Sequence, residues 1–149
     1  MSEINHSIVR RFVEDAFNGR NLSVLDEIVA DDFTNHDLPF PGLPSGSEGL
    51  KQSFAGFWSA FPDIQATTEQ FIADEDKVAL LVSLRGTHRG ELMGIPPTER
   101  EMSVRVVEIF RLVGGQIAER WGVVDRTALM KQLGVVPEGA PADPIAAAR

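Results

Sequence analysis

The chain of 149 residues contains no cysteine and no tyrosine. Without cysteine there is no disulfide bond and no thiolate ligand for a metal ion. Without tyrosine the chain lacks one of the side chains that commonly donate a hydrogen bond to an oxyanion. These absences exclude a disulfide-stapled scaffold and a cysteine-based metal centre, and they narrow the chemistry open to an active site.

Basic residues and long apolar runs are also scarce. Lys and Arg number 14 against 22 Asp and Glu, which gives a formal net charge of −8. Because no basic cluster is present, we expect neither a nucleic acid nor an anionic membrane as a partner. No segment approaches the roughly 20 apolar residues that cross a bilayer, and the N-terminal region has no signal-type run. The expectation is a cytoplasmic protein.

The hydrophobic content of 43% suffices for one globular domain with a buried core. No change in composition marks a second domain before residue 135. Pro, Ala and Gly dominate from Pro137 to Arg149, so we expect residues 136–149 to form a poorly ordered tail. The sequence therefore predicts a single folded unit over residues 1–135.

The first part of this unit has the spacing of helices. Apolar residues recur at three- and four-residue intervals over 4–17, 22–29 and 47–61, and each run has a capping or terminating residue. Between the second and third runs, residues 33–37 read as a short strand. A loop rich in proline and glycine follows over 38–46.

The second part alternates with period two. The predicted strands are 64–72, 77–89, 101–113 and 116–124, followed by a short helix over 127–133. Gly114-Gly115 is a strong signal for a hairpin. Helices followed by consecutive antiparallel strands indicate an α+β fold, a curved sheet with three helices on its concave face. Such a layer would enclose a pocket.

The segment 117–125 carries the strongest functional signal. With strict period two, one face holds Ile117, Glu119, Trp121, Val123 and Asp125. Two carboxylates and an indole among apolar neighbours suit a cavity that binds an apolar molecule and moves protons. This pattern makes Glu119, Trp121 and Asp125 candidate residues of such a site, for binding a substrate or for moving protons.

Asp125 has a second interpretation that the sequence leaves open. It precedes the last predicted helix, where aspartate is among the best N-cap residues. A carboxylate that accepts backbone N–H bonds as a cap holds its charge strongly, which makes it a poor base.

Two histidines are further candidates. His36 lies beside the proline-rich loop, and His88 ends an apolar stripe at the next rim loop. Either could polarise a substrate carbonyl, and either could instead be a hydrogen-bonded structural residue. Histidines and acids do not occur at metal-ligand spacings, so we expect no metal site.

Aromatic and arginine side chains complete the predicted site. Phe33, Phe54 and Trp58 suit the lining of a pocket for a flat substrate, with plain core packing as the alternative. Arg111 could anchor an anion or pair across strands with Glu119. Four apolar residues of the 101–113 strand, Val104, Val106, Phe110 and Leu112, suggest an apolar convex face and hence a homodimer.

Several segments together resemble the SnoaL-like polyketide (ester) cyclase family, within the nuclear-transport-factor-like superfamily of cone-shaped α+β folds. They are Phe33–Asp37, Pro41–Pro44 with Gly46–Lys51, Ala60–Ile64, Gly86–Thr98, Glu119–Asp125 and Gln132–Gly134. One departure follows Pro96-Pro97-Thr98, where Glu99-Arg100 stands in place of the family's usual glycine and basic residue.

The resemblance implies an activity. Characterised members close a ring by intramolecular aldol condensation without metal or cofactor, and the matching motif gives the acid/base role to Asp125. The family's partner histidine is not clearly matched by His36 or His88. We therefore expect a cyclase for a small, apolar, carbonyl-rich substrate.

Two alternatives stay open beside that expectation. The first is a non-catalytic, dimeric small-molecule-binding protein on the same fold. The second is an epoxide-hydrolase-like enzyme, in which Arg105, Arg111, Glu119 and Asp125 would activate water.

Overall fold

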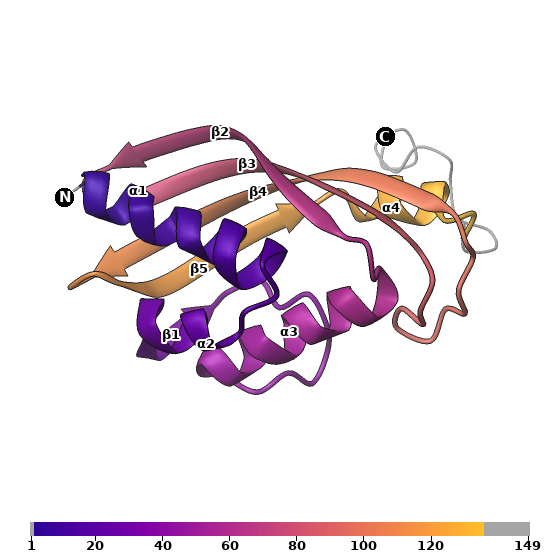
Figure 1. Ribbon diagram of the computed structural model, residues 1–149, viewed down its shortest axis with the longest axis horizontal. Coiled ribbons are helices and arrows are strands. Elements are labelled where there is room, and N and C mark those ends of the chain that lie inside the picture. The colour runs from indigo at the N-terminus through magenta and orange to yellow at the C-terminus, as the bar shows by residue number, and fades with distance from the viewer. Residues whose placement is uncertain (1, 136–149) are drawn as a thin grey trace, which may run out of the picture.

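In the computed structural model, which describes residues 2–135, five strands form one curved sheet (Figure 1). The strands are β1 (Val29–Asn35), β2 (Gln65–Asp74), β3 (Lys77–Thr87), β4 (Glu101–Val113) and β5 (Gln116–Val124). Their order across the sheet is β1-β5-β4-β3-β2. β1 runs parallel to β5, and all other neighbours are antiparallel. The predicted α+β fold is confirmed, and the predicted tail, 136–149, lies outside the described residues.

Most of the helices lie on one side of this sheet (Figure 1). They are α1 (Ser2–Arg11), the π-helix η1 (Phe12–Asn18), α2 (Ser23–Ile28), α3 (Gly46–Ala60) and, at one end, α4 (Arg126–Gln132). The predicted elements are present, with two differences. The first predicted helix changes to π geometry at Phe12, and the first strand begins at Val29 rather than Phe33. Among the described residues, no helix is long and apolar enough to span a bilayer.

Alternate residues of β4 build the core beneath these helices. Six of them point to the helices, and the apolar five are at most 5% exposed: Met102, Val104, Val106, Phe110 and Leu112. The ring of Phe12 packs edge-on against both Phe54 and Phe110, with centroid separations of 5.3 and 5.0 Å. This cluster joins η1, α3 and β4, and each buried ring contributes about 1.5–3 kcal/mol.

The outer, convex face of the sheet differs from the prediction. The residues expected there, Val104, Val106, Phe110 and Leu112, instead form the core, because the helices cover the more apolar side of β4. The apolar residues that do lie on the convex face include Val107, Ile109 and Val123, and they are 47%, 37% and 71% exposed.

A β-bulge changes the face assignment of β5. Arg111 pairs with Glu119 and Leu112 pairs with Ile117, so Ala118 is an extra residue in the strand. Beyond this bulge, Arg120, Gly122 and Val124 point to the helices, and the residues between them point outward. The prediction that Ile117, Glu119 and Trp121 share one face is wrong, because the bulge interrupts the period of two.

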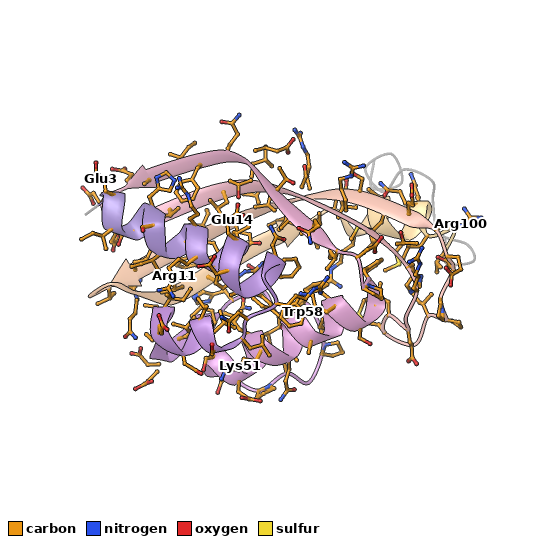
Figure 2. The ribbon with its side chains drawn as sticks, viewed as in Figure 1. Glu3, Arg11, Glu14, Lys51, Trp58 and Arg100 are labelled. Atoms are coloured by element: carbon orange, nitrogen blue, oxygen red, sulfur yellow. The ribbon has the colours of Figure 1, made fainter. Side chains whose placement is uncertain are left out.

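Two ion pairs connect the short helix α2 to its neighbours. Arg11 on α1 and Lys51 on α3 are labelled in Figure 2. Arg11 reaches Glu27 at 2.8 Å, and Lys51 reaches Asp26 at 2.7 Å. Surface pairs of this kind contribute little to stability, because water screens the two charges. The helical layer is therefore held chiefly by its buried aromatic side.

Candidate active site

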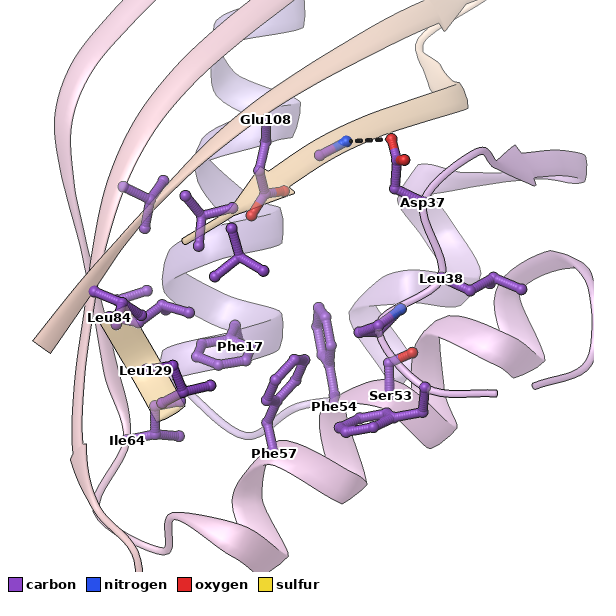
Figure 3. Close-up of a pocket in the computed structure, with 18 of the residues that line it drawn as sticks. Phe17, Asp37, Leu38, Ser53, Phe54, Phe57, Ile64, Leu84, Glu108 and Leu129 are labelled. Atoms are coloured by element: carbon purple, nitrogen blue, oxygen red, sulfur yellow. Dashed lines mark hydrogen bonds between the residues drawn. The ribbon is translucent and has the colours of Figure 1, made fainter. Parts of the chain in front are cut away.

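A cavity of about 380 Å³ lies between the concave face of the sheet and the helices (Figure 3). Its volume is within the range of sites for small organic ligands. Most of its wall is apolar, including Phe17, Phe54, Phe57, Leu84, Val106 and Leu129. The predicted pocket is thus present, and its lining suits an apolar molecule.

Four polar residues gather in one part of the cavity wall: Asn35, Asp37, Glu108 and Arg120. Arg120 Nε donates to Glu108 Oε2 at 3.2 Å. Its Nη1 donates to Asn35 Oδ1 and to the Asp37 carbonyl oxygen, each at 3.1 Å. The side chains of Glu108 and Arg120 are only 16% and 15% exposed. This polar cluster is therefore organised around one guanidinium.

Gly122 makes room for that guanidinium. A Cβ at this position would lie 2.7 Å from Arg120 Cζ, so the guanidinium occupies the space that a side chain would take. The Gly122 N–H donates to Asp37 Oδ2 at 2.9 Å, which joins the loop after β1 to β5 (Figure 3). Gly122 also faces Glu108 directly in the strand register. The absence of a side chain at Gly122 therefore allows the Arg120 guanidinium to lie against β5, beside Glu108.

The cluster has the parts of an acid/base site. A carboxylate on the cavity wall can accept a proton from a bound molecule, and the adjacent guanidinium can stabilise negative charge on oxygen. Sequence analysis missed Glu108, although one signal was available. It is the single charged residue in the otherwise apolar inward stripe of β4.

Asp125 lies outside this site. Its Oδ1 accepts a hydrogen bond from the backbone N–H of Ala128 at 2.9 Å, so Asp125 is the N-cap of α4. The residue is exposed, and it is not part of the cavity wall although Val124 and Arg126 on either side are. The expectation that its carboxylate faces the cavity is wrong, and the capping interpretation accounts for its contacts.

His36, Arg111, Glu119 and Trp121 form a separate cluster on the convex face. Glu119 bonds to His36 Nε2 at 2.9 Å and to Arg111 Nη2 at 2.7 Å. These two partners, His36 first, lower the pKa of the Glu119 carboxyl. The His36 ring stacks on Trp121 at 4.8 Å. None of the four lines the cavity, so their predicted roles in catalysis or substrate binding gain no support from the geometry.

His88 is fully buried and structural in its contacts. Its Nδ1 accepts from the Thr98 N–H at 3.2 Å, and its backbone bonds to Arg100 and Glu99. Its Nε2 is buried without a hydrogen-bond partner among the described residues. His88 therefore holds the rim loop that carries Leu92 and Met93 to the cavity, rather than lining the cavity itself.

The predicted aromatic residues divide between wall and core. Phe54 lines the cavity. Phe33 is a core residue at 3% exposure, and Trp58 packs beside Phe17 and under the Arg20 guanidinium. Of the predicted substrate-binding residues, the structure thus places Phe54 in the site. In the part of the chain that the structure describes, no three acidic or histidine side chains lie close enough to hold a metal ion.

Known proteins share both the sequence and this architecture. Among curated proteins, the chain is 28% identical over 120 residues to nogalonic acid methyl ester cyclase of Streptomyces nogalater, covering 80% of this chain and 90% of the relative. Among solved structures it is similar to IdmH, a presumed polyketide cyclase from Streptomyces antibioticus. That match has 32% identity, a TM-score of 0.75, and covers 88% of this chain and 99% of IdmH.

A presumed hydroxylase, AclR from Streptomyces galilaeus, is also similar. It has 28% identity and a TM-score of 0.78, and the match covers 92% of this chain and all of AclR, 100%. The family model of the SnoaL-like polyketide cyclases matches residues 7–133, which include every element that builds the cavity except the start of α1. The chain belongs to the SnoaL-like polyketide cyclase family.

Proposed function

We propose that this protein closes a ring in a small, carbonyl-rich, polyketide-like substrate, with Glu108 as the acid/base. The observation that carries the proposal is the Glu108–Arg120 pair on the wall of a largely apolar cavity. The similarity to a cyclase of nogalonic acid methyl ester supports the substrate class.

The proposed reaction needs only groups that the cavity provides. Glu108 accepts the proton from a carbon between two substrate carbonyls, and Arg120 stabilises the resulting enolate oxygen. The enolate carbon attacks a second carbonyl of the same molecule, which forms the new C–C bond. The alkoxide then takes the proton back from Glu108. The product is an isomer of the substrate, so the balance requires no cofactor.

The cavity would supply much of the rate enhancement by holding one flexible molecule in a folded conformation. Its apolar wall also keeps water from competing for the enolate. The aromatic side chains Phe17, Phe54 and Phe57 are suited to pack against a flat ring system.

A turnover assay with nogalonic acid methyl ester tests this proposal. Glu108→Gln should lower turnover by about a hundredfold or more, because it removes the proton acceptor and keeps the shape of the side chain. Asp125→Asn is the matched comparison, since asparagine also caps helices. The family resemblance assigns the acid/base role to Asp125, and a loss of turnover confined to Asp125→Asn would overturn the role of Glu108.

One observation favours a second candidate, the activation of water. Asn35, Glu108 and Arg120 together could hold a water molecule against an electrophile such as an epoxide. The arginines that the sequence suggested for activating water do not face the cavity. On the outer face, Arg105 pairs with Glu69 and Arg111 pairs with Glu119. Incorporation of heavy oxygen from labelled water into a diol would support this candidate. Ligand binding without turnover would support a binding protein.

We also propose that the convex face mediates homodimer formation. Val107, Ile109 and Val123 are exposed there beside Trp121, and the Arg111–Glu119 pair borders them. Apolar residues with an aromatic anchor and a charged rim are typical of protein interfaces. Sedimentation should show a dimer at micromolar concentration, and Ile109→Glu should shift it to monomer.

A further inference from the structure

We propose that one end of the cavity binds an alkyl chain of the substrate and adapts to the shape of that chain. This inference rests on the proposed function only in that a substrate occupies the same cavity. The sequence contains four methionines, and the three that follow Met1 all lie in the cavity wall: Met93, Met102 and Met130. The part of the wall that these three residues form is called the methionine end below.

The three methionines come from different elements that meet at one end of the cavity. Met93 belongs to the loop between β3 and β4, Met102 is the second residue of β4, and Met130 lies on α4. The loop runs directly into the start of β4. Gln132 of α4 bonds to both backbone groups of Ser103, accepting at 2.6 Å and donating at 2.9 Å. The loop, the start of β4 and α4 therefore converge at the methionine end.

The methionine end lies away from the proposed acid/base pair. On β4, six residues separate Met102 from Glu108, which corresponds to at most about 20 Å of extended strand. The inward residues between them, Val104 and Val106, are apolar and line the cavity. A ligand whose carbonyl groups lie at Glu108 would therefore extend its apolar part toward the methionine end.

The backbone conformation of Met93 is a separate argument for a role of its side chain. Leu92 and Ile95 bond to each other through both backbone groups, at 3.0 and 2.8 Å, and close a tight turn. The two central residues of this turn, Met93 and Gly94, have φ values of 46° and 83°. A turn with two positive φ values favours asparagine or glycine at its first central position, and methionine there costs free energy. What methionine adds in return is an apolar side chain on the cavity wall.

Methionine suits a subsite that must accept more than one shape. Its side chain is unbranched, has three rotatable bonds and fills irregular spaces. Arg126, one turn before Met130 on α4, is exposed, so its charge can remain in water. Near Glu108, by contrast, hydrogen bonds hold the Arg120 guanidinium in one arrangement. The cavity thus combines a fixed polar part for the reacting carbonyls with an adaptable apolar part for an alkyl chain.

A binding experiment with two esters tests the proposal. Methyl 2-naphthoate and butyl 2-naphthoate share a flat ring system and a carbonyl group, and they differ by three methylene groups. Each buried methylene raises affinity by about fourfold, so the wild-type protein should bind the butyl ester at least about tenfold more tightly in a fluorescence titration. Met93→Asn should reduce this difference to about threefold or less, because it removes apolar wall from the methionine end.

The choice of asparagine separates a binding role from a structural one. Because asparagine is favoured at this turn position, Met93→Asn should unfold at the same temperature as the wild type or a higher one. A smaller preference for the butyl ester in a variant of undiminished stability cannot come from a damaged fold. Thermal unfolding, measured beside the titrations, checks this.

Leu38→Asn is the matched control. Leu38 is 45% exposed and Met93 is 46% exposed, and both line the cavity. Figure 3 shows Leu38 beside Asp37, across the cavity from Leu129 of α4. Leu38→Asn should therefore preserve the ratio of the two affinities even where it lowers both. Equal binding of both esters by the wild type, no binding of either, or equal effects of the two variants on the ratio would each overturn the proposal.

The isobutyl ester tests whether the methionine end adapts. It has the same number of carbon atoms as the butyl ester and differs in being branched. The wild-type protein should bind the two isomers with affinities within about threefold of each other, because flexible methionines can rearrange around the branch. A larger preference for either isomer would contradict an adaptable wall.

These outcomes are independent of turnover. If Met93→Asn loses the preference for the butyl ester and Glu108→Gln has no effect on any reaction, the alkyl subsite stands and the proposed catalytic role falls. If Glu108→Gln abolishes turnover and the wild type binds the methyl and butyl esters equally, the cyclase stands and the alkyl subsite falls.

Discussion

Two glutamate–arginine pairs join β4 to β5 from opposite faces of the sheet. Glu108 and Arg120 meet inside the cavity, and Arg111 and Glu119 meet on the convex face. The inner side chains are 16% and 15% exposed, whereas the outer ones are 31% and 25% exposed. The outer pair has the richer surroundings, with a histidine and a tryptophan. The comparison shows that a cluster of functional side chains does not by itself locate a site, because the inner pair lines the cavity and the outer pair does not.

Adjacent residues of β4 provide the largest expected difference between the faces. Val106 is 5% exposed and Val107 is 47% exposed. Val106→Asp would bury an unpaired carboxylate and should destabilise the fold by more than about 4 kcal/mol. Val107→Asp should leave the stability of the protomer unchanged and should weaken only the proposed association of two protomers. Urea unfolding of both variants checks this, and equal losses would contradict the assignment of the two faces.

The position of the inner arginine can be changed without removing it. Gly122→Ala should push the Arg120 guanidinium away from Glu108, because the new methyl group would occupy its place. We expect turnover to fall by about tenfold to a hundredfold with the fold intact. Val107→Ala, on the convex face at 47% exposure and outside the cavity wall, is the control. Unchanged turnover in Gly122→Ala would argue against a reacting role for Arg120.

The cap at the end of β5 should affect stability rather than chemistry. Asp125→Ala removes the acceptor for the Ala128 N–H, and loss of such a cap costs about 1 kcal/mol. Asp125→Asn should retain most of that stability. Thermal unfolding of the two variants, followed beside turnover, separates a cap from a catalytic base.

The smallest effect concerns Asp63, at the entrance to β2. The backbone N–H of Thr87, at 2.7 Å, and then the Thr87 hydroxyl, at 2.8 Å, lower the pKa of its carboxyl. A lowered folded-state pKa stabilises the fold above the ordinary value of 3.8, and this stabilisation is lost as pH falls through the folded-state pKa. Asp63→Asn should therefore be less stable than wild type at pH 7. The difference should shrink below pH 3.8 in acid-titrated urea unfolding.

Much of the fold could be predicted from local sequence. The four long strands follow from alternation, and Gly114-Gly115 makes the expected hairpin with φ values of 57° and 81°. The spacing of apolar residues predicts α3, and Pro62 just beyond it predicts where the helix ends. The pairing of β1 with β5 in parallel could not be predicted, because it joins segments more than 80 residues apart.

The residues of the site were harder to predict than the fold. One residue, Ala118, explains most of the difference between the predicted and the observed site residues. Ala118 bulges out of β5 and exchanges the inward and outward faces for the rest of the strand. Strict alternation consequently pointed to Glu119 and Trp121 instead of Arg120 and Gly122. Nothing local distinguishes Ala118 from its neighbours, since the bulge depends on the register with β4.

The hydrogen bonds that His88 makes across the base of its loop bear on how the specificity of the cavity could change. His88 bonds to the far end of its loop through its backbone N–H, its carbonyl and its ring, at Arg100, Glu99 and Thr98. These hydrogen bonds hold the two ends of the loop together without help from the residues between them. Residues 91–97, which include Leu92 and Met93 of the cavity wall, could therefore differ between relatives while the sheet keeps its shape.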